Sequence, residues 1–170
     1  EDTEREMYYE TKSMLHKQGF ERYEISNYAK PGYECRHNIG YWTGIEYLGL
    51  GLGASSYIQG FRFHNESDLS LYDKIQMNGT DADEKLHQEI TRLSDKEKME
   101  EFMFLGLRMI KGVSGSEFFQ RFGQNMWNVY GNVLNKLKDE GLIIVDMPDV
   151  RLSDYGIDVS NYVLSEFLLD

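Results

Sequence analysis

The sequence contains a single cysteine, Cys35, among its 170 residues. One thiol cannot form a disulfide within the chain, and it cannot supply the three or four thiolates that hold an iron–sulfur cluster. The sequence also lacks a run of about 18 apolar residues, the length that a membrane-spanning helix needs. Its first residues show no basic segment followed by an apolar stretch, so we expect no signal peptide and a cytoplasmic protein.

Positive charge is scarce as well, because 18 Lys and Arg residues face 29 Asp and Glu residues and the formal net charge is −11. Proteins that bind the phosphates of nucleic acids need clustered Lys and Arg, so we expect no nucleic-acid partner. Apolar residues, by contrast, make up 41% of the sequence and aromatic residues 14%. This composition is typical of a globular protein with a packed core.

The first part of the chain alternates between helical and extended patterns. Residues 3–18 have the amphipathic spacing of a helix, and residues 20–29 alternate as a strand does. Residues 46–58, EYLGLGLGASSYI, are apolar and rich in glycine, which predicts a buried strand that runs into a tight turn. This order of elements is typical of the last βα units of an α/β sheet or barrel.

A short helix and a polar segment follow. Residues 67–79 predict a helix with Ser67 or Asp68 at its N-terminus and Gly79 at its end. Residues 80–91 are polar, and we interpret them as a linker with room for another short helix.

The second part of the chain has stronger helical signals. Ser94 and Glu97 form a capping box, and Ser116 is the expected cap of the next helix. The predicted elements are helices over 94–112, 114–123 and 125–141, a hairpin from 142–146 and 150–154, and a last helix over 158–169. Three helices, a hairpin and a closing helix are typical of a winged-helix-like domain. Its third helix carries as many acids as bases near its end, which favours a structural domain over a DNA-binding one.

The stretch ECRHNIGYW, residues 34–42, holds the residues with the most chemistry. A thiolate at Cys35 and an imidazole at His37 are both iron or zinc ligands, but no second pair lies nearby. His37 with Asn38, Tyr41 and Trp42 suits a flat macrocycle, on which aromatic rings stack while histidine ligates iron. An ordinary aromatic corner with a hydrogen-bonded histidine has the same spacing, so both interpretations stay open.

The segment GLGLGAS, residues 49–55, lacks the G-x-G-x-x-G pattern and the lysine of phosphate-binding loops, which excludes those two nucleotide sites. Its glycines favour close packing against a neighbour or a ligand. His16, His64 and His87 stand apart from one another, and we interpret each as a surface or packing residue.

Several motifs, taken in order, are similar to those of one known family. The segments YEISNYAKPGYECRHNIGYW, YLGLGLGASSY and GFRFHN resemble the oxygen-independent coproporphyrinogen III oxidase-like family of radical S-adenosylmethionine (SAM) proteins, HemN and HemW. The H-N-x-x-Y-W form resembles the HemW, or heme chaperone, branch. FMFLGLRMIKGVS, LNKLKDEGLI and RLSDYGIDVSNYV resemble the C-terminal domain of the same family.

The resemblance implies a protein more than twice as long, whose earlier part is a partial (β/α) barrel with three cysteines. Those cysteines would hold a [4Fe–4S] cluster that binds SAM, and Cys35 is not one of them. The expected fold is a mixed α+β and α/β arrangement. It comprises the last barrel elements at residues 1–78, a linker at 79–92 and the winged-helix-like C-terminal domain at 93–170.

The resemblance also implies functional residues and partners. Heme contact is expected at His37, Asn38, Tyr41 and Trp42, with His37 as iron ligand, and the SAM and substrate cavity at Gly51, Gly53 and Ala54. The implied function is heme binding and delivery to an acceptor protein, with the cluster and SAM supporting or regulating that step. One alternative is oxidative decarboxylation of coproporphyrinogen III, and another is a winged-helix regulatory module. We expect the chain alone to be inactive in radical chemistry.

Overall fold

The computed structural model describes residues 2–75 and 82–169. By their contacts they form two compact units, unit 1 from residues 1–44 and 99–170, and unit 2 from residues 45–98. This division differs from the predicted domain boundaries at 78 and 93, which stay a prediction. None of the described helices combines the length and the hydropathy of a membrane span.

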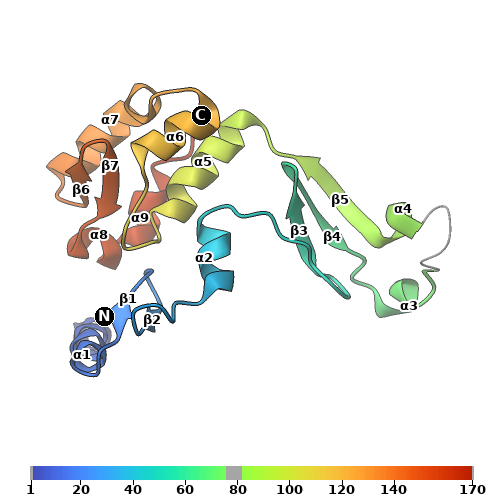
Figure 1. Cartoon of the computed structure of the whole chain (residues 1–170), viewed down its shortest axis with the longest axis horizontal. Coiled ribbons are helices and arrows are strands. Elements are labelled where there is room, and N and C mark those ends of the chain that lie inside the picture. Colours follow the sequence, from blue (N-terminus) through green and yellow to red (C-terminus); the bar gives the residue numbers. More distant parts are fainter. Residues whose placement is uncertain (1, 76–81, 170) are drawn as a thin grey trace. The chain divides into compact units, whose positions relative to one another are not determined.

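The elements of the two units are labelled in Figure 1. Unit 1 contains α1 (Asp2–Lys17), β1 (Glu21–Arg22), β2 (Tyr28–Ala29), α2 (Arg36–Trp42), most of α5 (Asp95–Gly106), α6 (Gly115–Phe122), α7 (Met126–Asp139), β6 (Ile143–Asp146), β7 (Asp149–Leu152), α8 (Asp154–Asp158) and α9 (Ser160–Ser165). Unit 2 contains β3 (Ser55–Ile58), β4 (Phe61–Asn65), α3 (Leu69–Tyr72), α4 (Ala82–Leu86), β5 (His87–Arg92) and the start of α5.

Unit 1 begins with the predicted amphipathic helix, α1. The single strand expected over residues 20–29 is wrong, because β1 and β2 are two short strands that pair antiparallel. The Glu24 carboxylate explains the turn between them, since it accepts hydrogen bonds from the backbone of Ser26 and the side-chain amide of Asn27. A side chain that bonds its own neighbours in this way reverses the chain locally.

The core of unit 1 lies between α5, α6, α7 and the β6–β7 hairpin (Figure 1). Phe118, Met103, Leu107 and Leu134 are fully buried there. The predicted order of three helices, hairpin and closing helical segment is confirmed, with two corrections. Ser116 does not cap α6, which begins at Gly115 with Ser114 at the N-cap position, two residues before the predicted cap. The last helix divides at Val159 into α8 and α9.

Two glycines bring the main chain against the hairpin. A Cβ atom on Gly112, whose φ is +73°, would lie 2.0 Å from the carbonyl oxygen of Val150. A Cβ on Gly156 would lie 1.9 Å from the carbonyl oxygen of Leu142. Only a residue without a side chain fits such an approach. Val113 and Val150 can then exchange backbone hydrogen bonds of 2.8 and 3.0 Å, which join the segment before α6 to β7.

Ion pairs join α1 to α8 within unit 1. The Lys12 ammonium lies 2.9 Å from an Asp154 carboxylate oxygen, and Arg5 lies 3.0 Å from Asp158. The hydrogen bond from Lys12 lowers the pKa of Asp154. The N-terminal helix is therefore tied to the closing helices, which come from the other end of the chain.

Unit 2 is a three-stranded antiparallel sheet in the order β3-β4-β5. β5 occupies residues 87–92, where a linker was predicted, while the expected extra short helix is present as α4. Asp68, one of the two predicted caps, caps α3 by accepting hydrogen bonds from the backbone of Ser70 and Leu71. The hydrogen bond from the Ser70 hydroxyl, together with these backbone bonds, lowers the pKa of Asp68. The helix predicted over residues 67–79 is shorter than expected, because α3 ends at Tyr72. The predicted last residue, Gly79, lies outside the described residues.

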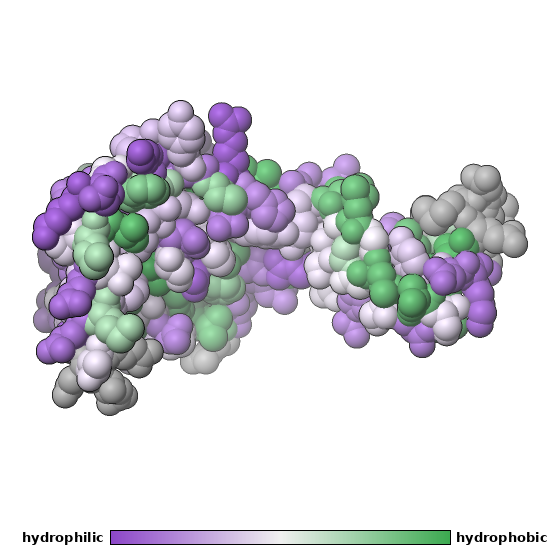
Figure 2. Space-filling view, turned by 90° about the horizontal axis from the view of Figure 1, so that it is seen from below, coloured by the Kyte–Doolittle hydropathy of each residue, from purple (hydrophilic) through white to green (hydrophobic). Residues whose placement is uncertain are grey.

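The buried strand expected over residues 46–58 is wrong except at its end. Only residues 55–58 form a strand, β3. Leu48, Leu50 and Leu52 are exposed by 58%, 82% and 44%, and apolar side chains are visible on the surface of unit 2 (Figure 2). The prediction of burial rested on apolar composition alone. Within unit 2 no described helix or strand covers these leucines, so they are exposed.

Candidate functional site

The residues RHNIGYW form a helix, α2, which sequence reasoning did not predict. A helix advances by about 100° per residue, so positions four apart lie on one face. His37 therefore shares a face with Tyr41, and Asn38 shares the adjoining face with Trp42. The H-N-x-x-Y-W spacing thus gathers all four predicted residues on one side of α2.

His37 and Tyr41 form the exposed part of this group. Their rings meet edge to face, with centroids 4.7 Å apart and planes at 84°. Both side chains are exposed, Tyr41 by 37%. In the described part of the chain His37 makes no hydrogen bond. A neutral imidazole carries one nitrogen lone pair that can coordinate a metal ion such as iron. At His37 no described residue occupies this lone pair.

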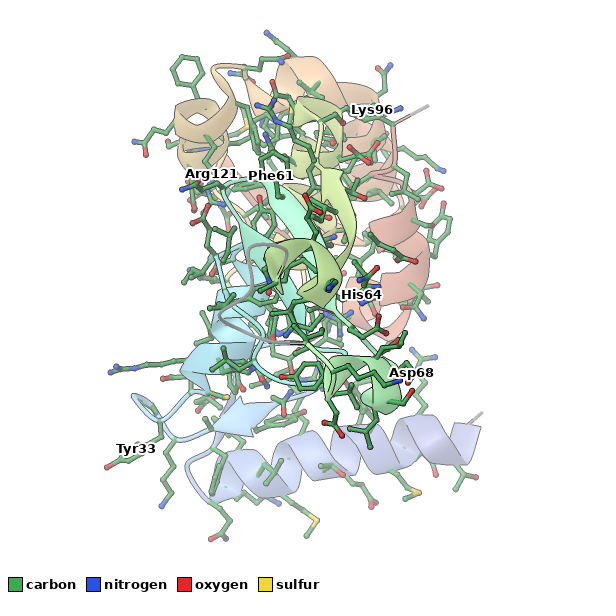
Figure 3. The ribbon with its side chains drawn as sticks, turned by 90° about the vertical axis from the view of Figure 1, so that its right-hand side faces the viewer. Tyr33, Phe61, His64, Asp68, Lys96 and Arg121 are labelled. Carbon is green, nitrogen blue, oxygen red and sulfur yellow. The ribbon has the colours of Figure 1, made fainter. Side chains whose placement is uncertain are left out.

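The other three histidines each have a contact within the protein. His16 lies 2.9 Å from the Glu21 carboxylate. His64, labelled in Figure 3, has Nδ1 2.8 Å from the carbonyl oxygen of Asn65. His87 packs against the ring of Phe63 with centroids 4.5 Å apart. His16 and His64 are thus bonded within the protein and His87 is half-buried, whereas His37 is exposed and its ring contact is with the exposed Tyr41.

Trp42 is partly buried and faces its own protein. The Arg108 guanidinium lies over the indole ring, 4.4 Å from its centroid. The indole Nε1 is buried and has no hydrogen-bond partner among the described residues. One face of Trp42 is thus occupied by Arg108, so the expected stacking of Trp42 on a porphyrin would be limited to its other face.

The second predicted group, Gly51, Gly53 and Ala54, lies in unit 2, and hydrogen bonds from Asn65 hold its backbone. The side-chain amide of Asn65 donates to the carbonyl oxygen of Gly51 at 2.8 Å and to that of Gly49 at 3.3 Å. The backbone of Asn65 also donates to the carbonyl oxygen of Ala54 at 2.9 Å. Asn65 is 4% exposed, and its Oδ1 is buried without a partner in the described residues. It holds the glycine segment in place, a role that sequence reasoning missed although GFRFHN ends on this residue.

The residues present fit two implied groups differently. The free imidazole of His37 and the exposed ring of Tyr41 fit a heme, which needs an axial nitrogen and apolar contact. Cys35 precedes α2, is exposed and makes no capping bond. Within residues 2–75 and 82–169 no three His, Cys, Asp or Glu side chains gather into a metal site. With one thiol, this chain does not fit an iron–sulfur cluster by itself.

Comparisons with known proteins show which family this chain resembles. The model of the HemN C-terminal domain matches residues 93–159. Heme chaperone HemW of Lactococcus lactis is 35% identical over 170 residues, which is 100% of this chain and 43% of the relative. HemW of Bacillus subtilis is 36% identical over 99% of this chain and 43% of its own length.

A solved structure of coproporphyrinogen III oxidase (HemN) from Escherichia coli, described as a radical SAM enzyme, has the same fold. It superimposes with a TM-score of 0.71 at 17% identity, over 95% of this chain and 40% of that one. The mixed α/β fold class is thereby confirmed. The chain spans less than half the length of these relatives. Its motifs, its matched C-terminal domain and its fold all agree, and the chain belongs to the HemN/HemW family of radical SAM proteins.

Proposed function

We propose that the full-length protein binds heme and delivers it to an acceptor protein, with His37 as ligand of the heme iron. The observation that carries this proposal is the exposed imidazole on α2, which is unbonded within the described residues and lies beside an exposed aromatic ring. The HemW relatives, 35% and 36% identical, are named heme chaperones. Heme is here the cargo, and the acceptor is a protein of the same, cytoplasmic, compartment.

The residues of α2 would make different contacts with heme. His37 supplies the nitrogen lone pair to the iron, and Tyr41 lies against one side of the porphyrin. Asn38 and Trp42, one helical face further, lie beside the macrocycle, and Trp42 also anchors α2 through Arg108. A ligand on an exposed helix can be given up to a second protein, which suits delivery better than permanent storage.

The glycine segment would serve the other part of the family's chemistry. We propose that Gly51, Gly53 and Ala54 face the SAM and substrate cavity, where the lack of side chains lets a ligand approach the backbone. The hydrogen bonds from Asn65 fix the carbonyl oxygens of Gly49 and Gly51 and so shape this segment. When bound, a [4Fe–4S] cluster would supply the electron for reductive cleavage of SAM. Its ligands would come from outside this sequence.

The test of the heme site is a titration of full-length, cluster-loaded protein with hemin. We expect His37→Ala to weaken binding and change the Soret band while the unfolding midpoint stays the same. His16→Ala, His64→Ala and His87→Ala are matched controls and should leave both spectrum and affinity unchanged. A normal spectrum for His37→Ala would contradict the ligand role.

Two further assays address the alternatives. Decarboxylation of coproporphyrinogen III by the full-length protein would favour the oxidase and replace the chaperone proposal. A salt-dependent shift of DNA by residues 93–170 would favour a winged-helix regulatory module, which the acidic charge of the chain opposes.

A further inference from the structure

Helix α2 is too short to be stable by itself. It has seven residues, none of which is buried, and Cys35 at its N-terminus makes no side-chain cap. Isolated helices below about 12 residues are marginal in water, so contacts from elsewhere must hold such a helix. Whatever holds α2 also sets the position of His37.

Two arginines of the HemN C-terminal domain contact consecutive residues at the end of α2. The Arg108 guanidinium stacks on Trp42, 4.4 Å from the ring centroid. Both terminal nitrogens of Arg121 donate to the carbonyl oxygen of Thr43, each at 3.2 Å. Carbonyls at the C-terminus of a helix lack helical partners and carry partial negative charge, which a guanidinium satisfies.

The backbone that carries Arg108 is fixed. Its carbonyl oxygen accepts a hydrogen bond of 3.0 Å from Ile25, and Ile110 donates to Tyr23 at 3.1 Å. The segment after α5 thus pairs with the turn between β1 and β2. Arg108 can therefore act as a rigid support for Trp42.

The side chain of Arg121, labelled in Figure 3, is fixed as well. It pairs with Glu117 one helical turn earlier on α6, and it lies over the ring of Phe102, 5.3 Å from the centroid. Phe102 in turn meets the fully buried Phe118 edge to face at 5.4 Å. The core of the C-terminal domain is connected in this way to the end of α2.

We propose that Arg108 and Arg121 are positioning residues that couple the C-terminal domain to the heme helix. This proposal rests on the proposed heme-binding function of His37 and deepens it. In this proposal the domain matched over residues 93–159 supplies no ligand to the iron. Its role toward heme is to orient α2 so that His37 and Tyr41 present one side to the ligand.

The experiment uses the full-length protein with Arg108→Met, Arg108→Lys, Arg121→Met and Arg121→Lys. Arg151→Met is the matched control, because Arg151 lies in the same domain and its ion pair, with Asp146 at 3.7 Å, is on the β6–β7 hairpin and not on α2. Three quantities are measured for each variant: hemin affinity with the Soret band, hydrogen exchange of residues 36–43, and the unfolding midpoint.

We expect each Met variant to weaken hemin binding about 3- to 30-fold, the range of a partly desolvated cation–π contact or a charged hydrogen bond. Exchange in residues 36–43 should become faster, while the Soret band of the remaining complex broadens. The Lys variants keep the cation and should recover part of the affinity. Arg151→Met should match the wild type.

The outcomes separate the two proposals. A wild type without hemin binding would contradict the heme site, and faster exchange in residues 36–43 of the Met variants would then still support the coupling of α2 to the domain. Hemin binding by the wild type and equally tight binding by all four variants would overturn the positioning role. A lowered unfolding midpoint without faster local exchange would overturn it too, because it would mark Arg108 and Arg121 as general structural residues.

Discussion

Each of the two compact units is stabilised internally by a different kind of contact. Unit 1 has an apolar core, in which residues such as Phe118 and Leu134 are completely buried. In unit 2 two of the most deeply buried described residues are polar, Ser56 at 0% exposure and Asn65 at 4%. Ser56 accepts a hydrogen bond from the backbone of Gly49, and Asn65 donates to Gly49 and Gly51. Side-chain packing therefore fixes unit 1, and hydrogen bonds fix much of unit 2.

The difference matters for the two candidate segments. Helix α2 depends on long side chains that reach it from a packed core, so loss of that core should disturb it. The glycine segment depends on a few directed bonds within its own sheet. We therefore expect core substitutions to disturb α2, and substitutions that remove a hydrogen bond to disturb the glycine segment.

The largest effect is expected at the core of unit 1. Phe118 is fully buried and meets the rings of Phe102, Phe122 and Tyr130. Phe118→Ala should lower the free energy of unfolding by about 3–5 kcal/mol, because it leaves a cavity. Denaturant unfolding measures this loss. Phe119→Ala is the control, since Phe119 is the next residue and 57% exposed. Similar losses for both would contradict a tightly packed core.

In unit 2 the corresponding position is Asn65. Asn65→Ala removes the donor to two glycine carbonyl oxygens, so the free energy of unfolding should fall by about 1–3 kcal/mol. Exchange or proteolysis within residues 48–54 should increase. Asn161→Ala, at an exposed position of α9, should change stability by less than about 0.5 kcal/mol. An unchanged glycine segment in Asn65→Ala would mean that the sheet alone holds it.

A smaller effect distinguishes the two adjoining faces of α2. Trp42→Ala removes the stack with Arg108 and should cost about 1–2 kcal/mol of unfolding free energy. His37→Ala should cost under about 0.5 kcal/mol, because His37 is exposed and bonded to nothing in the described part of the chain. Thermal unfolding of both variants provides the measurement. A large loss for His37→Ala would indicate a structural histidine.

The smallest effect concerns the cap of α5. Glu97 accepts hydrogen bonds from the hydroxyl and the backbone of Ser94, and these bonds lower its pKa below the ordinary value of 4.5. A carboxyl whose pKa is lower in the folded state stabilises the protein above pH 4.5, and this contribution disappears as the pH falls through the folded pKa. Wild type should therefore lose its advantage over Glu97→Gln as the pH falls below 4.5 and through the lowered pKa of Glu97. A pH-independent difference would show that the charge is irrelevant to the cap.

Local signals explain which elements could be predicted. Ser94 and Glu97 are three residues apart, and the apolar periodicity that follows is read directly from neighbouring positions. The same holds for α1, α7 and the β6–β7 hairpin. Their helical or alternating patterns continue over enough residues to indicate one type of secondary structure.

Non-local contacts explain most of what was missed. The turn between β1 and β2 is a local exception, because it depends on bonds from Ser26 and Asn27 to the Glu24 side chain, which no propensity encodes. Helix α2 has no capping signature, and the guanidinium that binds its end lies 78 residues away in the chain. The chemistry of His37 was visible in the sequence because residue type carries it. The arginines that contact the end of its helix were not, because only folding brings them there.

The close approaches at Gly112 and Gly156 impose a restriction of another kind. Residues in an apolar core can exchange volume with one another over evolutionary time, as long as the total space is filled. A main-chain contact of this kind offers no such exchange, because a single methyl group would overlap a carbonyl oxygen. In distant relatives whose core residues have changed, we therefore expect the glycine before α6 and the glycine after the β6–β7 hairpin to be conserved more often than most other positions of this domain.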